Sequence, residues 1–249
     1  MSRNTIPVDY YLDAASVFHY ATKEHFNLLL TGSSHRNTRT EMVLLRLSRR
    51  NKLKAIKYGK KLVYVSPQKA KGKNVDDLMI YPKIAHGLSC TEGLVRFWRA
   101  RTESEIIAER FFYGCGIVPE WGIRYPNGKM LLYEFSTKSN FQFSGLMNGK
   151  LNAYRRNLEK IEEKFQAKAV VVFVLDIPRT TVERYVGTLR GDVGSAADGD
   201  TSAPSGGDRF PSDPFYFVDY QTFLSVPIGE QLKAPIYFWM DGKEYPLTQ

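Results

Sequence analysis

Residues 117–136, IVPEWGIRYPNGKMLLYEFS, hold two apolar runs on either side of the pair Asn127-Gly128. An Asn-Gly pair between such runs is a strong signal for a tight turn, so this stretch predicts two antiparallel strands. Residues 169–175, AVVVFVL, are continuously apolar, which is typical of a strand buried on both faces. A polar segment at 145–165 with apolar residues at helical spacing lies between them. The pattern predicts a mixed α/β domain.

Further segments extend this domain on both sides. Residues 192–213 are rich in Gly, Ser, Ala and Asp, a composition that predicts a disordered surface loop. The remaining predicted elements are helices at 84–100 and 180–189 and strands at 106–113, 117–125, 129–136, 215–223 and 235–240.

The N-terminal part of the chain has a different pattern. Helical segments at 9–21, 23–30 and 37–51 precede two alternating runs, LKAIKY and KLVYVS. A Gly-Lys pair at 59–60 separates these runs and suits a tight hairpin turn. Three helices followed by a hairpin is the order of a winged helix-turn-helix module. In such modules the third helix enters the DNA major groove and the hairpin contacts the backbone.

A polar, lysine-rich stretch at 67–82 predicts a linker between the two parts. The expected domains are therefore a winged helix at 1–66 and a larger α/β domain at 83–249. No apolar run approaches the roughly 18–20 residues that span a bilayer. The first residues also lack the basic-then-apolar layout of a signal peptide. We expect a cytoplasmic protein with no membrane partner.

The net charge of +9 is unevenly distributed along the chain. Residues 1–75 contain 15 Lys/Arg against 4 Asp/Glu, which gives +11, whereas the rest contains 20 against 22, which gives −2. Phosphates neutralised by such a segment release counterions, so a polyanion is the natural partner. A basic surface that is only solvated is the alternative.

The residues expected to contact DNA lie on the third helix and on the hairpin. The start of the helix is where base contacts are usually made, and the hairpin lysines suit phosphates. These residues are Arg36, Asn37, Arg39, Thr40, Arg46, Arg49, Arg50, Lys57, Lys60 and Lys61. Two alternatives are that they form only the polar face of an amphipathic helix, or that the module contacts a protein.

Two carboxylates lie on either side of the predicted turn at 127–128. Glu120 and Glu134 fall on neighbouring strands, where they could hold a hard divalent ion such as Mg²⁺ or Mn²⁺. Lys138 or Lys150 could place a cation near a phosphate, and Glu92 is a candidate third ligand. The alternative is that both glutamates are exposed and only balance nearby lysines. The cysteines at 90 and 115 have no zinc-ligand spacing, and the sequence assigns no role to His86.

Several short motifs follow one another in a distinctive order. They are His-Gly-Leu at 86–88, Pro-Glu at 119–120, Tyr-Glu-Phe-Ser-Thr at 133–137 and Lys-x-x-x-Tyr at 150–154. Together with the winged helix, this order resembles the replication-relaxation proteins of plasmids and integrative elements over residues 8–190. The resemblance implies a DNA-binding protein of a mobile genetic element that acts in plasmid replication or DNA relaxation, or in its control.

The same resemblance implies that the second domain is similar to the PD-(D/E)xK nuclease core. Glu120 then corresponds to the first acid, where Asp is usual, and Glu134 to the second. Ser136 stands where the nuclease lysine belongs, so Lys150, or the nearer Lys138, is its expected replacement. The implied partners are double-stranded DNA, other replication or transfer proteins and a second copy of the chain.

Two other functions stay open from the sequence. One is an active metal-dependent DNA endonuclease, in which the carboxylates and the lysine cleave DNA. The other is a winged-helix transcriptional regulator whose second domain senses a ligand or dimerises.

Overall fold

A computed structural model describes residues 7–31, 38–98, 104–138, 144–189, 214–225, 236–240 and 243–247. These residues divide into two compact units, and the division lies between residues 102 and 103. Each unit has its own sheet. The fold is mixed α/β, as the sequence predicts. None of the described helices is both long enough and apolar enough to cross a membrane.

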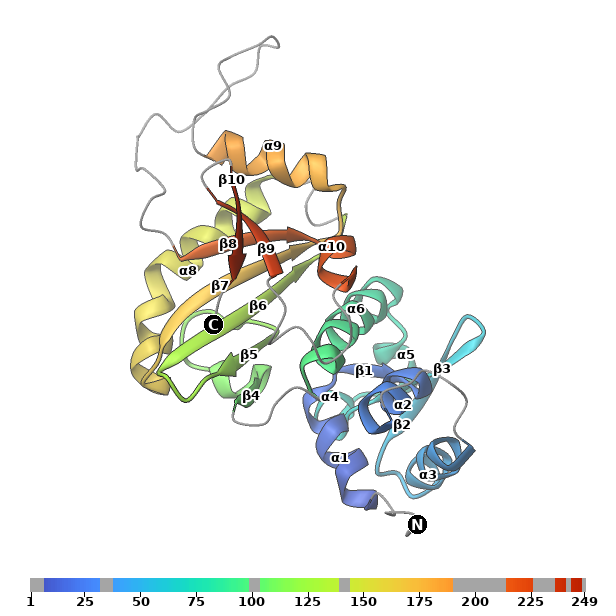
Figure 1. The fold of residues 1–249 in the computed structure, drawn as a ribbon. Coiled ribbons are helices and arrows are strands. Elements are labelled where there is room, and N and C mark those ends of the chain that lie inside the picture. The colour runs from blue at the N-terminus through green and yellow to red at the C-terminus, as the bar shows by residue number, and fades with distance from the viewer. Residues whose placement is uncertain are drawn as a thin grey trace. The chain divides into compact units, whose positions relative to one another are not determined.

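The first unit begins with three helices and a three-stranded antiparallel sheet, in blue and cyan in Figure 1. The strand order is β1-β3-β2, so the first strand pairs with the far strand of the hairpin. This arrangement matches the predicted winged helix. The elements are α1 (Val8–Val17), β1 (Tyr20–Thr22), α2 (Lys23–Thr31), α3 (Thr38–Arg49), β2 (Lys54–Tyr58) and β3 (Lys61–Val65).

The first unit extends beyond the predicted winged helix. The expected linker at 67–82 contains the short helices α4 (Pro67–Ala70) and α5 (Val75–Leu78), and α6 (Tyr81–Trp98) follows. The unit therefore ends after α6, which corrects the boundary predicted at 82/83.

Buried contacts explain why α6 belongs to this unit. Leu78 and Ile84 share a core with Val63 and Val65 of the hairpin. The Thr91 hydroxyl on α6 donates a 2.7 Å hydrogen bond to the backbone carbonyl of Tyr20 in β1. Because the segment is rich in lysine, its composition does not indicate that these few apolar residues are buried.

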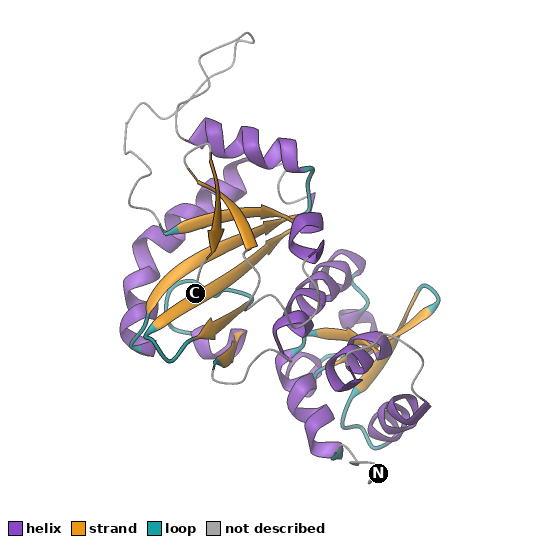
Figure 2. Cartoon of the chain, in the orientation of Figure 1, coloured by secondary structure: helices purple, strands orange, loops and turns teal. Residues whose placement is uncertain are grey.

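The second unit is built on a seven-stranded sheet of order β10-β9-β8-β7-β6-β5-β4. Strands β4, β5 and β6 form an antiparallel meander, and β6, β7 and β8 run parallel (Figures 1 and 2). The elements are β4 (Glu105–Ala108), a 3₁₀ helix η1 (Glu109–Phe112), β5 (Trp121–Arg124), β6 (Lys129–Ser136), α8 (Ser144–Phe165), β7 (Lys168–Leu175), α9 (Arg179–Leu189), β8 (Phe215–Asp219), α10 (Tyr220–Ser225), β9 (Ile236–Met240) and β10 (Lys243–Leu247).

The predicted hairpin between β5 and β6 is confirmed. The Tyr125 N–H donates a 2.9 Å hydrogen bond to the Lys129 carbonyl, and Gly128 has a positive φ of 76°. Glycine adopts that conformation without the clash that a Cβ brings, which explains its place in the turn. Some predicted strands are shorter, because residues 109–112 form η1 and residues 220–225 form α10. The expected loop at 192–213 lies outside the described residues.

Strand β6 separates two chemically different faces of the sheet. Met130 and Leu132 belong to the core cluster that includes Leu151 and Leu158 of α8. Because side chains alternate along a strand, Glu134 faces the same helix. Tyr133 and Phe135 face the other side, where both rings meet Phe223 of α10. One carboxylate of the buried strand is therefore directed toward α8.

Candidate nucleic-acid interface and buried carboxylate

Helix α3 has one apolar face and one cationic face. Thr40, Leu44 and Leu47 recur at helical spacing and are buried, with at most 4% of each residue exposed. The opposite face carries Arg39, Arg46 and Arg49, which are exposed. Arg50 follows directly after the helix and is also exposed. The apolar stripe therefore fixes the helix on its unit and leaves the arginines in solvent.

The hairpin adds three lysines to the cationic side chains of the first unit. Lys57, Lys60 and Lys61 are exposed, whereas Ile56 and Val63 of the same strands point into the core. Gly59 has a φ of 58° in the turn, a conformation that glycine adopts readily. Lysines at a tight turn can approach phosphates without moving the strands that hold them.

One predicted DNA contact, Thr40, is wrong, and two others lie outside the described residues. Thr40 has no exposed surface, so its side chain cannot meet a base without unfolding the helix. Its polar character suggested a contact, but its phase with Leu44 and Leu47 places it in the core. Arg36 and Asn37 lie outside the described residues. The other seven predicted contacts are exposed in the first unit.

In the second unit, Glu134 is held by two side chains of α8. The Lys150 ammonium donates to Oε1, and the Tyr154 hydroxyl donates to Oε2 at 2.9 Å. Lys150 and Tyr154 are four residues apart, so both project from the same side of the helix. The Glu134 side chain is 5% exposed and that of Lys150 is 38% exposed. The carboxylate is thus buried, while its cation reaches solvent.

The environment of Glu134 shifts its ionisation. Burial raises the pKa of the Glu134 carboxyl, although Lys150 and the Tyr154 hydrogen bond favour the ionised form. The charge of Glu120 adds to the rise. Burial, followed by the charge of Glu134, also raises the pKa of Tyr154 well above its usual value, so its phenol keeps the proton that it donates.

Glu120 reaches this cluster from the position before β5. Its backbone N–H donates a 3.0 Å hydrogen bond to the Tyr133 carbonyl of β6, and its side chain is half-buried. The structure therefore pairs Lys150 with Glu134, and its backbone pairing places Glu120 beside the strand that carries Glu134. Lys150, not Lys138, is the cation at Glu134, and Lys138 is exposed just after β6. The role of Tyr154 was not predicted, although its spacing from Lys150 is a usable signal.

The predicted third ligand, Glu92, is engaged within the first unit. It lies on α6, where Oε2 is 3.1 Å from His25 Nε2 and Oε1 is 3.3 Å from Arg96 Nη2. The hydrogen bond with His25 lowers the pKa of Glu92, against the opposing effect of burial. Glu92 therefore ties α2 to α6. On the same helix, His86 Nε2 lies 3.6 Å from Cys90 Sγ.

The carboxylate cluster has donors of the type that Mg²⁺ or Mn²⁺ prefers. Glu134 and Glu120 supply carboxylate oxygens, the usual ligands of hard cations. Each Glu134 oxygen accepts one hydrogen bond from α8, and a carboxylate oxygen can accept a second interaction. Both Glu134 oxygens are already engaged by α8, and among the described residues Glu134 belongs to no group of three or more potential metal ligands that lie within 4.8 Å of one another.

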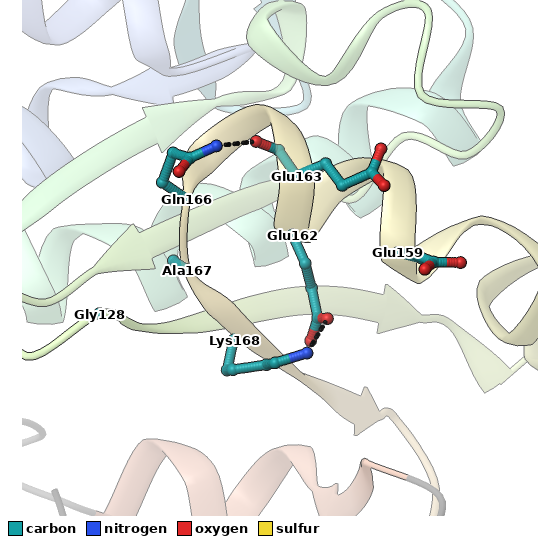
Figure 3. A pocket seen from close by; sticks show the side chains of 7 residues that line it. All are labelled: Gly128, Glu159, Glu162, Glu163, Gln166, Ala167 and Lys168. Carbon is teal, nitrogen blue, oxygen red and sulfur yellow. Dashed lines mark hydrogen bonds and ion pairs between the residues drawn. The ribbon is translucent and has the colours of Figure 1, made fainter.

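A pocket of about 390 Å³ lies elsewhere in the second unit, between the end of α8 and the start of β7 (Figure 3). Its lining includes Glu159, Glu162 and Glu163, but no residue of the Glu134 cluster. Lys168 pairs with Glu162 at 2.8 Å across it. The other two carboxylates make it acidic, so it does not suit a phosphate.

Comparison with protein-family models and with curated proteins found no match. Function is therefore inferred from the chemistry of the two sites: an exposed cationic helix and hairpin, and a buried carboxylate held by a lysine and a tyrosine.

Proposed function

We propose that this chain is a DNA-binding protein of a mobile genetic element, whose first unit binds double-stranded DNA through α3 and the β2–β3 hairpin. The observation that carries the proposal is the division of α3 into a buried apolar stripe and an exposed face with Arg39, Arg46 and Arg49. The hairpin lysines extend the same charge.

The geometry suits B-form DNA in two ways. An α-helix with its side chains is about 10–12 Å across, which matches the roughly 12 Å width of the major groove. Arginine can contact guanine edges or phosphates bidentately, and the hairpin lysines would neutralise phosphates of the backbone. DNA in the cytoplasm is the expected partner, with replication or transfer proteins or a second copy of the chain as further partners.

A role in replication or DNA relaxation, or in its control, is supported by the second unit. Three antiparallel strands, a helix and a parallel strand follow one another there, which is the order expected for a PD-(D/E)xK-like core apart from its first helix, because α6 belongs to the first unit. The pairing of Lys150 with Glu134 is consistent with a lysine moved from the strand to the following helix.

A second candidate function, DNA cleavage, is favoured by the ion pair between Lys150 and Glu134, and by Glu120, whose backbone N–H bonds to the Tyr133 carbonyl of the same strand β6. A divalent ion held by the two carboxylates would polarise a phosphodiester oxygen. The partly exposed Lys150 would place positive charge beside the phosphate. Tyr154 would hold Glu134, and thereby the lysine, in a fixed orientation.

DNA binding is tested by fluorescence anisotropy with a labelled duplex, comparing the wild type with Arg46→Ala/Arg49→Ala. Losing two phosphate contacts at physiological salt lowers affinity about 30-fold by counterion release. Arg156→Ala/Lys160→Ala, which removes two exposed charges of α8, is the matched control and should bind as the wild type does. Equal affinities of the first variant and the wild type would contradict the proposal.

Cleavage is tested by incubating supercoiled plasmid with the protein in Mg²⁺, in Mn²⁺ and in EDTA. The candidate predicts metal-dependent nicking that is lost in Glu134→Gln and kept in Glu163→Gln, an exposed glutamate of α8. Binding without nicking in every condition rejects the cleavage candidate and leaves DNA binding.

A further inference from the structure

One apolar side chain stands in the middle of the cationic face of α3. Met42 is three residues after Arg39 and four before Arg46, so the three lie side by side on the helix surface. Met42 is 59% exposed, which makes it, with Tyr113, the most exposed of the large apolar residues described. Leu45, one turn later on the same side, is 37% exposed.

Isolated apolar residues on a protein surface are common and need no explanation. The position of Met42 is different, because arginines flank it on the face that the proposed function directs toward DNA. A helix needs only cations to bind phosphates. A flexible thioether side chain among them adds a group that water solvates poorly and that phosphates cannot engage. The Met42 side chain would therefore contact an apolar group of a polyanionic partner.

The DNA major groove offers such a group. Each base pair presents polar donors and acceptors there, but thymine also presents its C5-methyl group, and apolar side chains contact it. The arginines on either side of Met42 would hold the helix against the phosphates and guanine edges. The thioether between them would then face the base edges.

We propose that Met42 is a specificity-determining residue that recognises the C5-methyl group of thymine in the major groove, flanked by Leu45. This inference rests on the proposed DNA-binding function and specifies how one surface of α3 selects sequence. Burial of one methyl group against Met42 is expected to strengthen binding about fourfold. Arg46 would strengthen binding to thymine and uracil duplexes equally.

The test uses two duplexes that differ only in the methyl group. One is a short alternating dA·dT duplex, and the other replaces every thymine by deoxyuridine, which keeps all Watson–Crick groups. The wild type should bind the thymine duplex at least about fourfold more tightly than the deoxyuridine duplex. Met42→Gln, which keeps the side-chain length, should bind both duplexes equally. Arg46→Ala should weaken both and keep the wild-type ratio.

The outcomes separate this inference from the proposed function. Equal wild-type affinities for the two duplexes, both weakened by Arg46→Ala, would overturn the role of Met42 and leave DNA binding in place. A thymine preference that survives in Met42→Gln would also overturn it. Absence of binding to either duplex would overturn the proposed function itself. Circular dichroism spectra of the variants check that α3 is intact, as expected for an exposed position.

Discussion

The charges of α3 and those around Glu134 are arranged in opposite ways. On α3 the apolar side chains are buried and the arginines stay in water. At β6 a carboxylate is buried, and both of its oxygens accept hydrogen bonds from α8. Exposed charges keep their solvation until a partner arrives, whereas a buried charge needs its partner inside the fold. The first arrangement suits recognition, and the second holds a helix on a sheet.

The largest expected effect follows from breaking the buried arrangement with Lys150→Met. Removing one member of a buried ion pair leaves the other charge uncompensated. Because Lys150 is partly exposed, we expect a loss of unfolding free energy near the lower end of the range for buried pairs, about 3 kcal/mol. Chemical denaturation at neutral pH measures it. Lys138→Met, an exposed position, is the control and should change stability by less than about 0.5 kcal/mol.

The same variant has a defined pH dependence. The pKa of Glu134 is raised in the folded protein, so its carboxyl stabilises the fold when the pH is below its pKa in the unfolded chain, near 4.5. That stabilisation is lost as the pH rises through the pKa of the folded state. Without Lys150, more stability is lost as Glu134 ionises. The destabilisation should therefore be full near neutral pH and small once Glu134 is protonated. A cost that is independent of pH would show that Lys150 acts only through packing.

The second effect comes from removing the exposed charges of the hairpin. Lys57→Ala/Lys60→Ala/Lys61→Ala should lower duplex affinity about 100-fold at physiological salt, because three phosphates keep their counterions. Stability should be unaffected, since the three side chains are in water. The matched control is Lys138→Ala/Arg156→Ala/Lys160→Ala, and an equal loss in that variant would place the DNA on the second unit instead.

A smaller effect separates the two donors to Glu134. Tyr154→Phe removes one hydrogen bond to a charged group and leaves the aromatic ring against Phe173, which costs about 1.5 kcal/mol. Thermal and chemical unfolding measure the change. Tyr113→Phe, at an exposed tyrosine, should be nearly neutral. A neutral Tyr154→Phe would mean that Lys150 alone stabilises the carboxylate.

The smallest effect concerns Glu92, whose ionisation behaves oppositely to that of Glu134. Its pKa is lowered in the fold by His25, so its contribution is present above about pH 4.5 and is lost as the pH falls through the folded pKa. Glu92→Gln should cost about 1 kcal/mol at neutral pH and little in acid. Hydrogen exchange of α2 and α6 amides at the two pH values measures the difference, and an unchanged cost in acid would contradict it.

The fold was accessible from the sequence where local signals were strong. The Asn127-Gly128 turn and the apolar run of β7 predicted the mixed sheet, and the alternation of apolar and polar residues predicted the hairpin of the first unit. The extent of the first unit was not accessible, because a few buried residues such as Leu78 and Ile84 lie in a lysine-rich context. Long-range packing, not composition, assigns α6 to its unit.

The candidate site was predictable by residue type but not by burial. Lys150 or Lys138 was expected near Glu134, and the structure pairs Lys150 with it. Thr40 had a suitable side chain for a base contact, but its helical phase buries it. Tyr154 was visible in the sequence only as part of the Lys-x-x-x-Tyr motif, because its hydrogen bond to Glu134 depends on how α8 crosses β6.

The salt dependence of duplex binding tests the central claim most directly. The logarithm of affinity should fall linearly with the logarithm of salt concentration for the wild type, and Arg46→Ala/Arg49→Ala should make the slope shallower by about two. That result would identify the cationic face of α3 as the DNA contact. An unchanged slope in the variant, or wild-type binding that does not respond to salt, would contradict it.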